Sequence, residues 1–285
     1  MTTRPGGRSP PGRVLAFGAA LRTFRADGEG AGLLYRLSVR ALKASLPSRW
    51  TRRLEALGLR RRPVDRATLI RRYAPGKSFA DIGCMWGIDG RDAFLAEESG
   101  ATRTIAVDIY PESATFLEEK KRRDSAVRFV RGDININEIA DEVGLSDVVL
   151  CSGVLYHTPD PFRLLTRLRS ICRETLILHT QSIPEMRGMR NVAVFYPFLP
   201  DEQRRIWDRG VGCQKAIRGP YEPESGYGNW FWGLTPSAIE SMLRCAGFEV
   251  HERFVSAFTC TFVCRSVAPR FVAASGAWVL REEAP

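Results

Sequence analysis

The sequence has little lysine, little histidine and no long apolar run. Five of its 42 basic residues are lysine, and three of its 285 residues are histidine. No stretch approaches the roughly 18 to 20 apolar residues that span a bilayer, and no repeat recurs at a period of about 20 to 50 residues. These absences exclude a polytopic membrane protein and a repeat array. With 44% hydrophobic and 26% charged residues, the composition is that of a globular chain with a sizeable core.

The seven cysteines form no CxxC pair. An odd count with this spacing, and with several cysteines inside apolar runs, is typical of free buried thiols in a reducing compartment. The sequence therefore predicts a cytoplasmic protein without a structural metal.

The net charge of +10 is concentrated at the start of the chain. Residues 1–75 contain 17 Lys or Arg and 4 Asp or Glu, a net of +13, whereas residues 76–285 contain 25 and 28, a net of −3. We expect a disordered basic leader over 1–30 and a basic helical extension over 31–75. Such a segment can attract RNA or an anionic membrane surface, although a solvated leader is the simpler interpretation.

From residue 76 to 268 the pattern alternates between short apolar runs and helical stretches. This alternation predicts a Rossmann-like, doubly wound α/β domain with a seven-stranded, mostly parallel sheet and an antiparallel terminal hairpin. The rhythm stops over 181–235, which we expect to form a substrate lid, and 269–285 is a C-terminal tail. The expected strands are 78–82, 104–107, 127–130, 147–151, 175–179, 249–256 and 259–266; the expected helices are 89–98, 112–123, 135–143, 161–172 and 236–246.

Two signals follow the first two expected strands. Asp81, Gly83 and Gly87 lie in a strand–turn–helix segment whose glycines let a ligand approach the backbone amides. Asp108 ends the next strand, where a carboxylate can accept hydrogen bonds from a ribose diol. The GxGxxG spacing of dinucleotide-binding enzymes is absent, which disfavours a nicotinamide cofactor.

Two further signals follow the third and fourth expected strands. Asp133 and Ile134 offer an acid and an apolar side chain that suit an adenine, although Asp133 could also simply cap a helix. Ser152, Tyr156 and His157 belong to the segment that follows the next buried strand. His157 is a candidate general base, or a residue that only shapes the pocket, whereas His179 and His251 are expected to be structural.

In this order the four signals resemble the class I S-adenosylmethionine-dependent methyltransferases. The resemblance implies that Asp81, Gly83 and Gly87 form the first cofactor motif, that Asp108 holds the ribose, and that Asp133 with Ile134 holds the adenine. It also implies that Ser152 and Tyr156 lie at the cofactor. The family's D-x-G-x-G-x-G pattern is broken here, because Met85 replaces the middle glycine.

A narrower resemblance covers Gly153–His157 and Gly228–Phe248, which are similar to the tRNA wobble-uridine carboxymethyl-transferring enzymes and their relatives. No residue can be matched to the extra carboxylate of their cofactor, so ordinary methyl transfer is favoured. The preferred hypothesis is transfer to a hydroxyl, or an amine, of a small molecule such as a sugar or specialised metabolite. A tRNA-modifying enzyme and a non-catalytic binding relative remain alternatives.

The aromatic-rich insertion supplies the candidate acceptor residues. Trp230, Trp232 and Tyr227 can stack on a planar acceptor or contact a sulfonium, although they can equally pack the insertion itself. Arg187 can receive an anionic substrate. The sequence does not indicate the oligomeric state.

Overall fold

The computed structural model describes residues 64–185, 190–197, 230–256 and 258–269, together with the backbone of 271–274 and 277–280. The leader over 1–30 and the expected basic helical extension up to residue 63 lie outside these residues, as do Tyr227 and Arg187.

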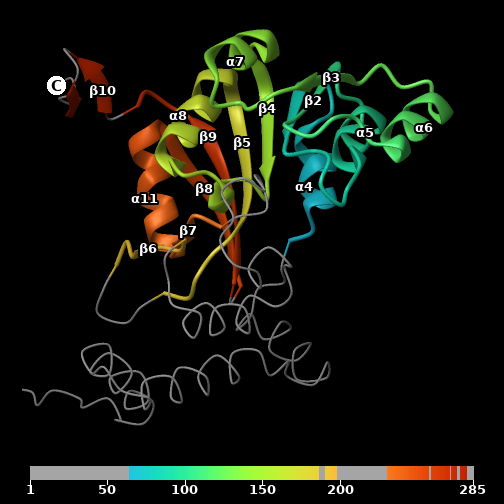
Figure 1. Ribbon diagram of the computed structural model, residues 1–285. Helices are drawn as coiled ribbons and strands as arrows, with labels where there is room; N and C mark the ends of the chain where they lie inside the picture. Colours follow the sequence, from blue (N-terminus) through green and yellow to red (C-terminus); the bar gives the residue numbers. More distant parts are fainter. Residues whose placement is uncertain are drawn as a thin grey trace, which may run out of the picture.

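Seven strands form one sheet in the order β3-β2-β1-β4-β5-β9-β8 (Figure 1). The first five pair in parallel, and β9 and β8 complete the sheet in antiparallel pairing. The strand order reverses between β1 and β4, so a ligand crevice is expected at the carboxyl ends of these strands. The strands are β1 (Ser78–Ile82), β2 (Arg103–Asp108), β3 (Arg128–Arg131), β4 (Ser146–Ser152), β5 (Cys172–Gln181), β8 (Phe248–Val255) and β9 (Thr259–Ser266).

Helices cover both faces of the sheet (Figure 1). Alternate residues of β1 face opposite ways: Phe79 packs with residues of α4 and α5, whereas Ala80 and Ile82 pack with residues of α7, α8 and α11. This doubly wound arrangement confirms the predicted fold class. The helices are α4 (Arg66–Tyr73), α5 (Arg91–Glu98), α6 (Ala114–Arg122), α7 (Asn137–Val143), α8 (Pro161–Ile171) and α11 (Pro236–Ala246), with a 3-10 turn η2 (Leu155–His157).

Local sequence signals fix where two of these helices begin. The Asp160 side chain caps α8 by accepting a hydrogen bond from the Arg163 amide, and Pro161 occupies the first turn. Thr235 caps α11 in the same way, followed by Pro236. Asp160 and Thr235 therefore mark where the loop before each helix ends and the helix begins.

The structure contains two strand pairs that the sequence pattern did not predict, and one helix that lies within the helical extension expected over 31–75. Helix α4 contributes Leu69 and Ile70 to the core beneath β1 and β5, so part of the expected basic extension packs as an integral part of the domain. Within the 181–235 insertion, β6 (Ala193–Phe195) and β7 (Trp232–Leu234) pair in antiparallel fashion. Strands β10 (Phe271–Ala274) and β11 (Ala277–Leu280) form a hairpin in the expected tail.

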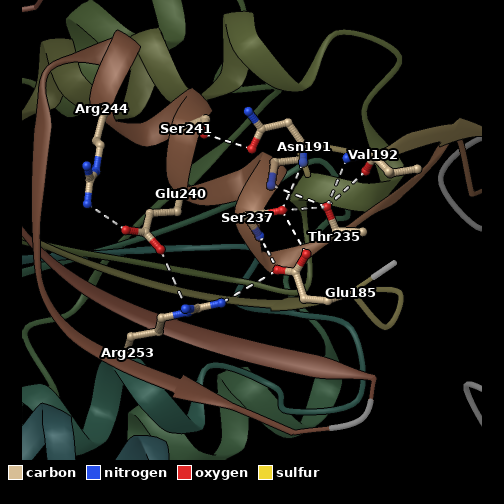
Figure 2. A network of polar contacts seen from close by, with 10 residues as sticks. Glu185, Asn191, Val192, Thr235, Ser237, Glu240, Ser241, Arg244 and Arg253 are labelled. Atoms are coloured by element: carbon tan, nitrogen blue, oxygen red, sulfur yellow. Dashed lines mark hydrogen bonds and ion pairs between the residues drawn. The ribbon is translucent and has the colours of Figure 1, made fainter. Parts of the chain in front are cut away.

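The described ends of the insertion are fastened to α11 and β8 by polar contacts (Figure 2). The Glu185 carboxylate accepts hydrogen bonds from the amide and hydroxyl of Ser237, at 2.6 and 2.8 Å. Arg253 of β8 lies 3.6 Å from the same carboxylate. The Thr235 amide donates to the Val192 carbonyl at 3.0 Å, which joins the two halves of the insertion. The β6–β7 strand pair is therefore held against α11 and β8 by these contacts.

Candidate functional site

A cavity of about 530 Å³, including its open mouth, lies at the carboxyl edge of the sheet. Its walls come from the ends of three neighbouring strands and from the segment after β4. The lining residues are 82–83, 107–109, 132–135, 154 and 157–159. The cavity therefore lies beside the reversal of strand order, where a parallel sheet of this kind binds its ligands.

Asp108 lies at the end of β2 with its side chain almost fully buried. One carboxylate oxygen accepts a hydrogen bond from the Met85 amide at 2.8 Å, and the other accepts one from the Tyr110 amide at 2.9 Å. Burial raises the pKa of Asp108, and these amides oppose part of that shift. Because a carboxylate oxygen accepts more than one hydrogen bond, both oxygens keep capacity for a ligand in the cavity.

Met85, which stands where the methyltransferase pattern has its middle glycine, does not fill the cavity. The Met85 side chain is 4% exposed and packs in the cluster around Phe94, Ala106 and Phe116, on the α5 and α6 side of the sheet. Its amide meanwhile orients Asp108. Methionine at the position of the family's middle glycine therefore adds core packing, while its backbone amide makes a hydrogen bond that a glycine could also make.

The β3 end of the cavity offers hydrogen-bond acceptors beside an apolar surface. Asp133 accepts hydrogen bonds from the amide and the side-chain nitrogen of Asn135, each at 2.9 Å. The Asn135 side-chain oxygen is buried and has no hydrogen-bond partner among the residues that the structure describes. Ile134, which is 3% exposed, lies between them in sequence and also lines the cavity. This wall suits a flat, amino-bearing ring.

Asp81 is fully buried in β1, and neither of its carboxylate oxygens has a partner that meets hydrogen-bond criteria within the described part of the chain. The pKa of Asp81 is raised well above its usual range, chiefly because burial penalises the charged form and secondarily because Asp92 is near. Arg66 opposes these two effects through its positive charge. A cationic ligand group near Asp81 would relieve this penalty.

Arg66 joins this cluster from α4, and the sequence analysis did not identify it as a site residue. Its guanidinium donates to the Ser152 hydroxyl at the end of β4. It also lies 3.3 Å from the carboxylate of Asp92 in α5. The side chain of Arg66 is 21% exposed, and its guanidinium is held near the sheet edge by contacts with two other elements, β4 and α5. Its position twelve residues before the start of β1, in a basic stretch, gave no signal that distinguished it.

His179 lies on β5 next to this cluster. Its Nδ1 atom is 2.8 Å from the Thr261 hydroxyl. Burial, and secondarily the charge of Arg66, lower the pKa of His179 to about 4. This supports the expected structural role, because the ring stays neutral at pH 7.

The lowered pKa predicts acid sensitivity. Below pH 6.5 the unfolded chain protonates His179 while the folded protein does not, so the free energy of unfolding should fall as the pH drops from 6.5 towards 4. The shift corresponds to about 3 kcal/mol over that range. Urea unfolding at several pH values should show that the free energy of unfolding falls less steeply with falling pH in His179→Gln than in the wild type. His251→Gln, at an exposed position, is the control; equal slopes in all three proteins would contradict the prediction.

Aromatic rings surround the segment that follows β4. Tyr156 packs against the rings of His157 and Trp230, with centroid distances of 4.1 and 4.5 Å. Trp230 is 2% exposed and its indole nitrogen has no hydrogen-bond partner within the described ranges. The Trp232 indole donates to the Pro159 carbonyl at 2.9 Å. These contacts hold His157 at the cavity wall and place Trp232 at its rim.

The structure brings five of the predicted site residues together at the cavity: Gly83, Asp108, Asp133, Ile134 and His157. Four others are not among the lining residues but belong to the segments that support them: Asp81, Gly87, Ser152 and Tyr156. Trp230 packs in the core of the insertion and Trp232 lies at the rim.

The described ranges contain no group of three or more His, Cys, Asp or Glu side chains placed to hold a metal ion. None of the helices found there is long and apolar enough to cross a membrane.

Comparisons with known proteins match this architecture. Residues 80–177 match the methyltransferase domain family. The tRNA U34 carboxymethyltransferase of Campylobacter hominis is 33% identical over 99 residues, which are 33% of this chain and 32% of that protein. The chain thus matches about a third of the length of this curated relative.

Two solved structures of the N-terminal domain of EvdMO1 are similar in fold. The one with SAH bound has a TM-score of 0.50 and 18% identity, covering 72% of this chain and 81% of that chain. The one obtained with SAH and D-fucose has a TM-score of 0.50 and 17% identity, covering 78% and 97%. The Rossmann-like methyltransferase fold and the predicted resemblance to methyltransferases are thereby confirmed.

Proposed function

We propose that this protein is an S-adenosylmethionine-dependent methyltransferase that methylates a hydroxyl of a small molecule, with His157 as the general base. The observation that carries the proposal is the cavity, where the glycine turn after β1, Asp108, Asp133 and His157 lie on one surface. The methyltransferase domain over 80–177 and the SAH in the similar fold support it. A cytoplasmic location remains a prediction from the cysteines.

The residues present fit this cofactor. Asp108 has acceptor capacity for a ribose diol, and Asp133, Asn135 and Ile134 suit an adenine. Asp81 is a buried acid that lacks a partner within the described residues, and it suits an ammonium group. The guanidinium of Arg66, held close by, suits a carboxylate. The site therefore complements both charges of an amino acid as well as a nucleoside.

When bound, S-adenosylmethionine supplies a methyl group that is already activated for displacement. The chain's own task is to orient the acceptor and to exclude water. His157, on the loop wall, would take the proton of an acceptor hydroxyl, a role typically worth about 10²–10⁴-fold in rate. Tyr156 and Trp230 would position the imidazole by packing against it.

A tRNA-modifying methyl or carboxymethyl transferase is the second candidate. The match to the tRNA U34 carboxymethyltransferase over 99 residues favours it, as does the net charge of +13 over residues 1–75. This candidate predicts that deleting the basic segment abolishes RNA binding and that affinity falls steeply with salt. The small-molecule candidate predicts turnover that tolerates salt.

Calorimetric titration with S-adenosylmethionine, S-adenosylhomocysteine and the carboxylated donor tests both candidates. We expect micromolar binding of the first two and at least tenfold weaker binding of the third. The reason is that the described cavity lining contains the acids Asp108 and Asp133 and no Lys or Arg, so nothing in it would pair with an added carboxylate. A preference for the carboxylated donor would favour the RNA candidate, and no binding of any donor would refute both.

A further inference from the structure

Two aromatic rings outside the cofactor cavity form an exposed corner on the β6–β7 strand pair. Phe195 and Trp232 are directly opposite one another in the strand register. Their ring centroids are 5.0 Å apart and their planes are inclined by 61°. Phe195 is 44% exposed, and Trp232 is partly buried against the core. The two strands carry no charged residue.

This corner is fixed beside the cavity. The Trp232 indole donates to the carbonyl of Pro159, and Pro159 lines the cavity two residues after His157. The Phe231 amide donates to the Tyr156 carbonyl at 2.9 Å, so the residue just before β7 is bonded to the same loop. Hydrogen bonds between Thr235 and Val192 join the two strands at the end of the pair away from Phe195 and Trp232 (Figure 2). Such a preformed surface binds with a smaller ordering cost than a segment that must first fold.

We propose that Phe195 and Trp232 take a neutral carbohydrate ring of the methyl acceptor, with a hydroxyl directed towards His157. The proposal rests on the proposed function and names its substrate class. The negative face of an aromatic ring attracts the positively polarised C–H groups of a sugar. Because their centroids are 5.0 Å apart, the two inclined rings touch each other and form a corner in which a thick, puckered ring can contact both, whereas a nucleobase stacks flat on a single ring.

The charge of the rim favours a neutral ligand. Across residues 157–160, 193–195 and 232–234 the formally charged side chain is that of Asp160, an acid. Nucleic acids need cations along their phosphates, and single strands combine these with stacking rings. The described rim supplies the rings without the cations. It therefore fits an uncharged glycoside better than a nucleotide.

The test is NMR titration of the protein loaded with S-adenosylhomocysteine, using methyl glycosides of neutral hexoses and 6-deoxyhexoses, with uridine and unfractionated tRNA as competitors. We expect a glycoside to bind in the millimolar range with saturation transfer to its ring C–H protons. Phe195→Ala should weaken that binding at least fivefold, and Phe195→Tyr should retain it. Leu145→Ala, at a residue 49% exposed before β4, is the matched control and should change nothing.

The outcomes separate this inference from the proposed function. If no glycoside binds, if uridine or tRNA binds more tightly, or if Phe195→Ala binds as the wild type does, the inference is overturned. The S-adenosylhomocysteine dissociation constant should change less than twofold in every variant. If S-adenosylhomocysteine fails to bind while a glycoside still binds through Phe195, the proposed function falls and the carbohydrate surface stands.

Discussion

Asp108→Ala should weaken S-adenosylhomocysteine binding at least 100-fold. Two charge-assisted hydrogen bonds to the ribose would be lost, each worth about 1.5–3 kcal/mol. The amides of Met85 and Tyr110 would also lose the acceptor that holds the loop, so the cavity wall would shift. Asp108→Asn keeps one acceptor and the side-chain shape, and we expect a loss of about tenfold. Calorimetric titration measures both.

Two controls separate binding from folding in this experiment. Burial raises the pKa of Asp108, which means that the folded protein disfavours its charged form above that pKa. Asp108→Asn removes this penalty but turns a side-chain NH2 towards the amide of Met85 or of Tyr110, so its free energy of unfolding at pH 7 is measured beside that of the wild type to separate lost folding from lost binding. Asp141→Ala changes an exposed acid on α7 and should leave binding unaltered. Wild-type affinity in Asp108→Ala would refute the assigned role.

His157→Gln should lower kcat for a hydroxyl acceptor by about 10²–10⁴-fold while KM and the S-adenosylhomocysteine dissociation constant change less than threefold. Glutamine preserves polarity and approximate length but cannot take the proton. The wild-type rate should fall at acid pH as an imidazole base becomes protonated, and this acid limb should disappear in the variant.

The pH profile distinguishes a base from a residue that only shapes the pocket. If His157 only packs against Tyr156 and Trp230, the variant will lose affinity and keep the acid limb. His251→Gln is the matched control, because His251 is exposed on β8. An unchanged kcat in His157→Gln would contradict the assignment and would favour an acceptor that needs no base.

Much of the fold was predictable because the apolar periodicity directly encodes buried strands. The expected strand over 78–82 is β1, and the expected helix over 236–246 is α11. The pairing of β6 with β7 was not predictable, because each strand is three residues long and 36 residues separate them. Helix α4 lies within the helical extension expected over 31–75, but its packing in the core was not predictable, because the arginines around it masked the short apolar pair Leu69 and Ile70.

The candidate site shows the same division. The segments that carry Asp108, Asp133 and His157 follow predicted strands, and parallel strands bring their carboxyl ends to one edge, so the sequence alone determined that these residues meet. Only the tertiary structure decided that Met85 packs into the core, that Arg66 reaches Ser152 from a preceding helix, and that Phe195 faces Trp232. These contacts join residues far apart in the chain through side-chain packing, and periodicity holds no information about which distant side chains will meet.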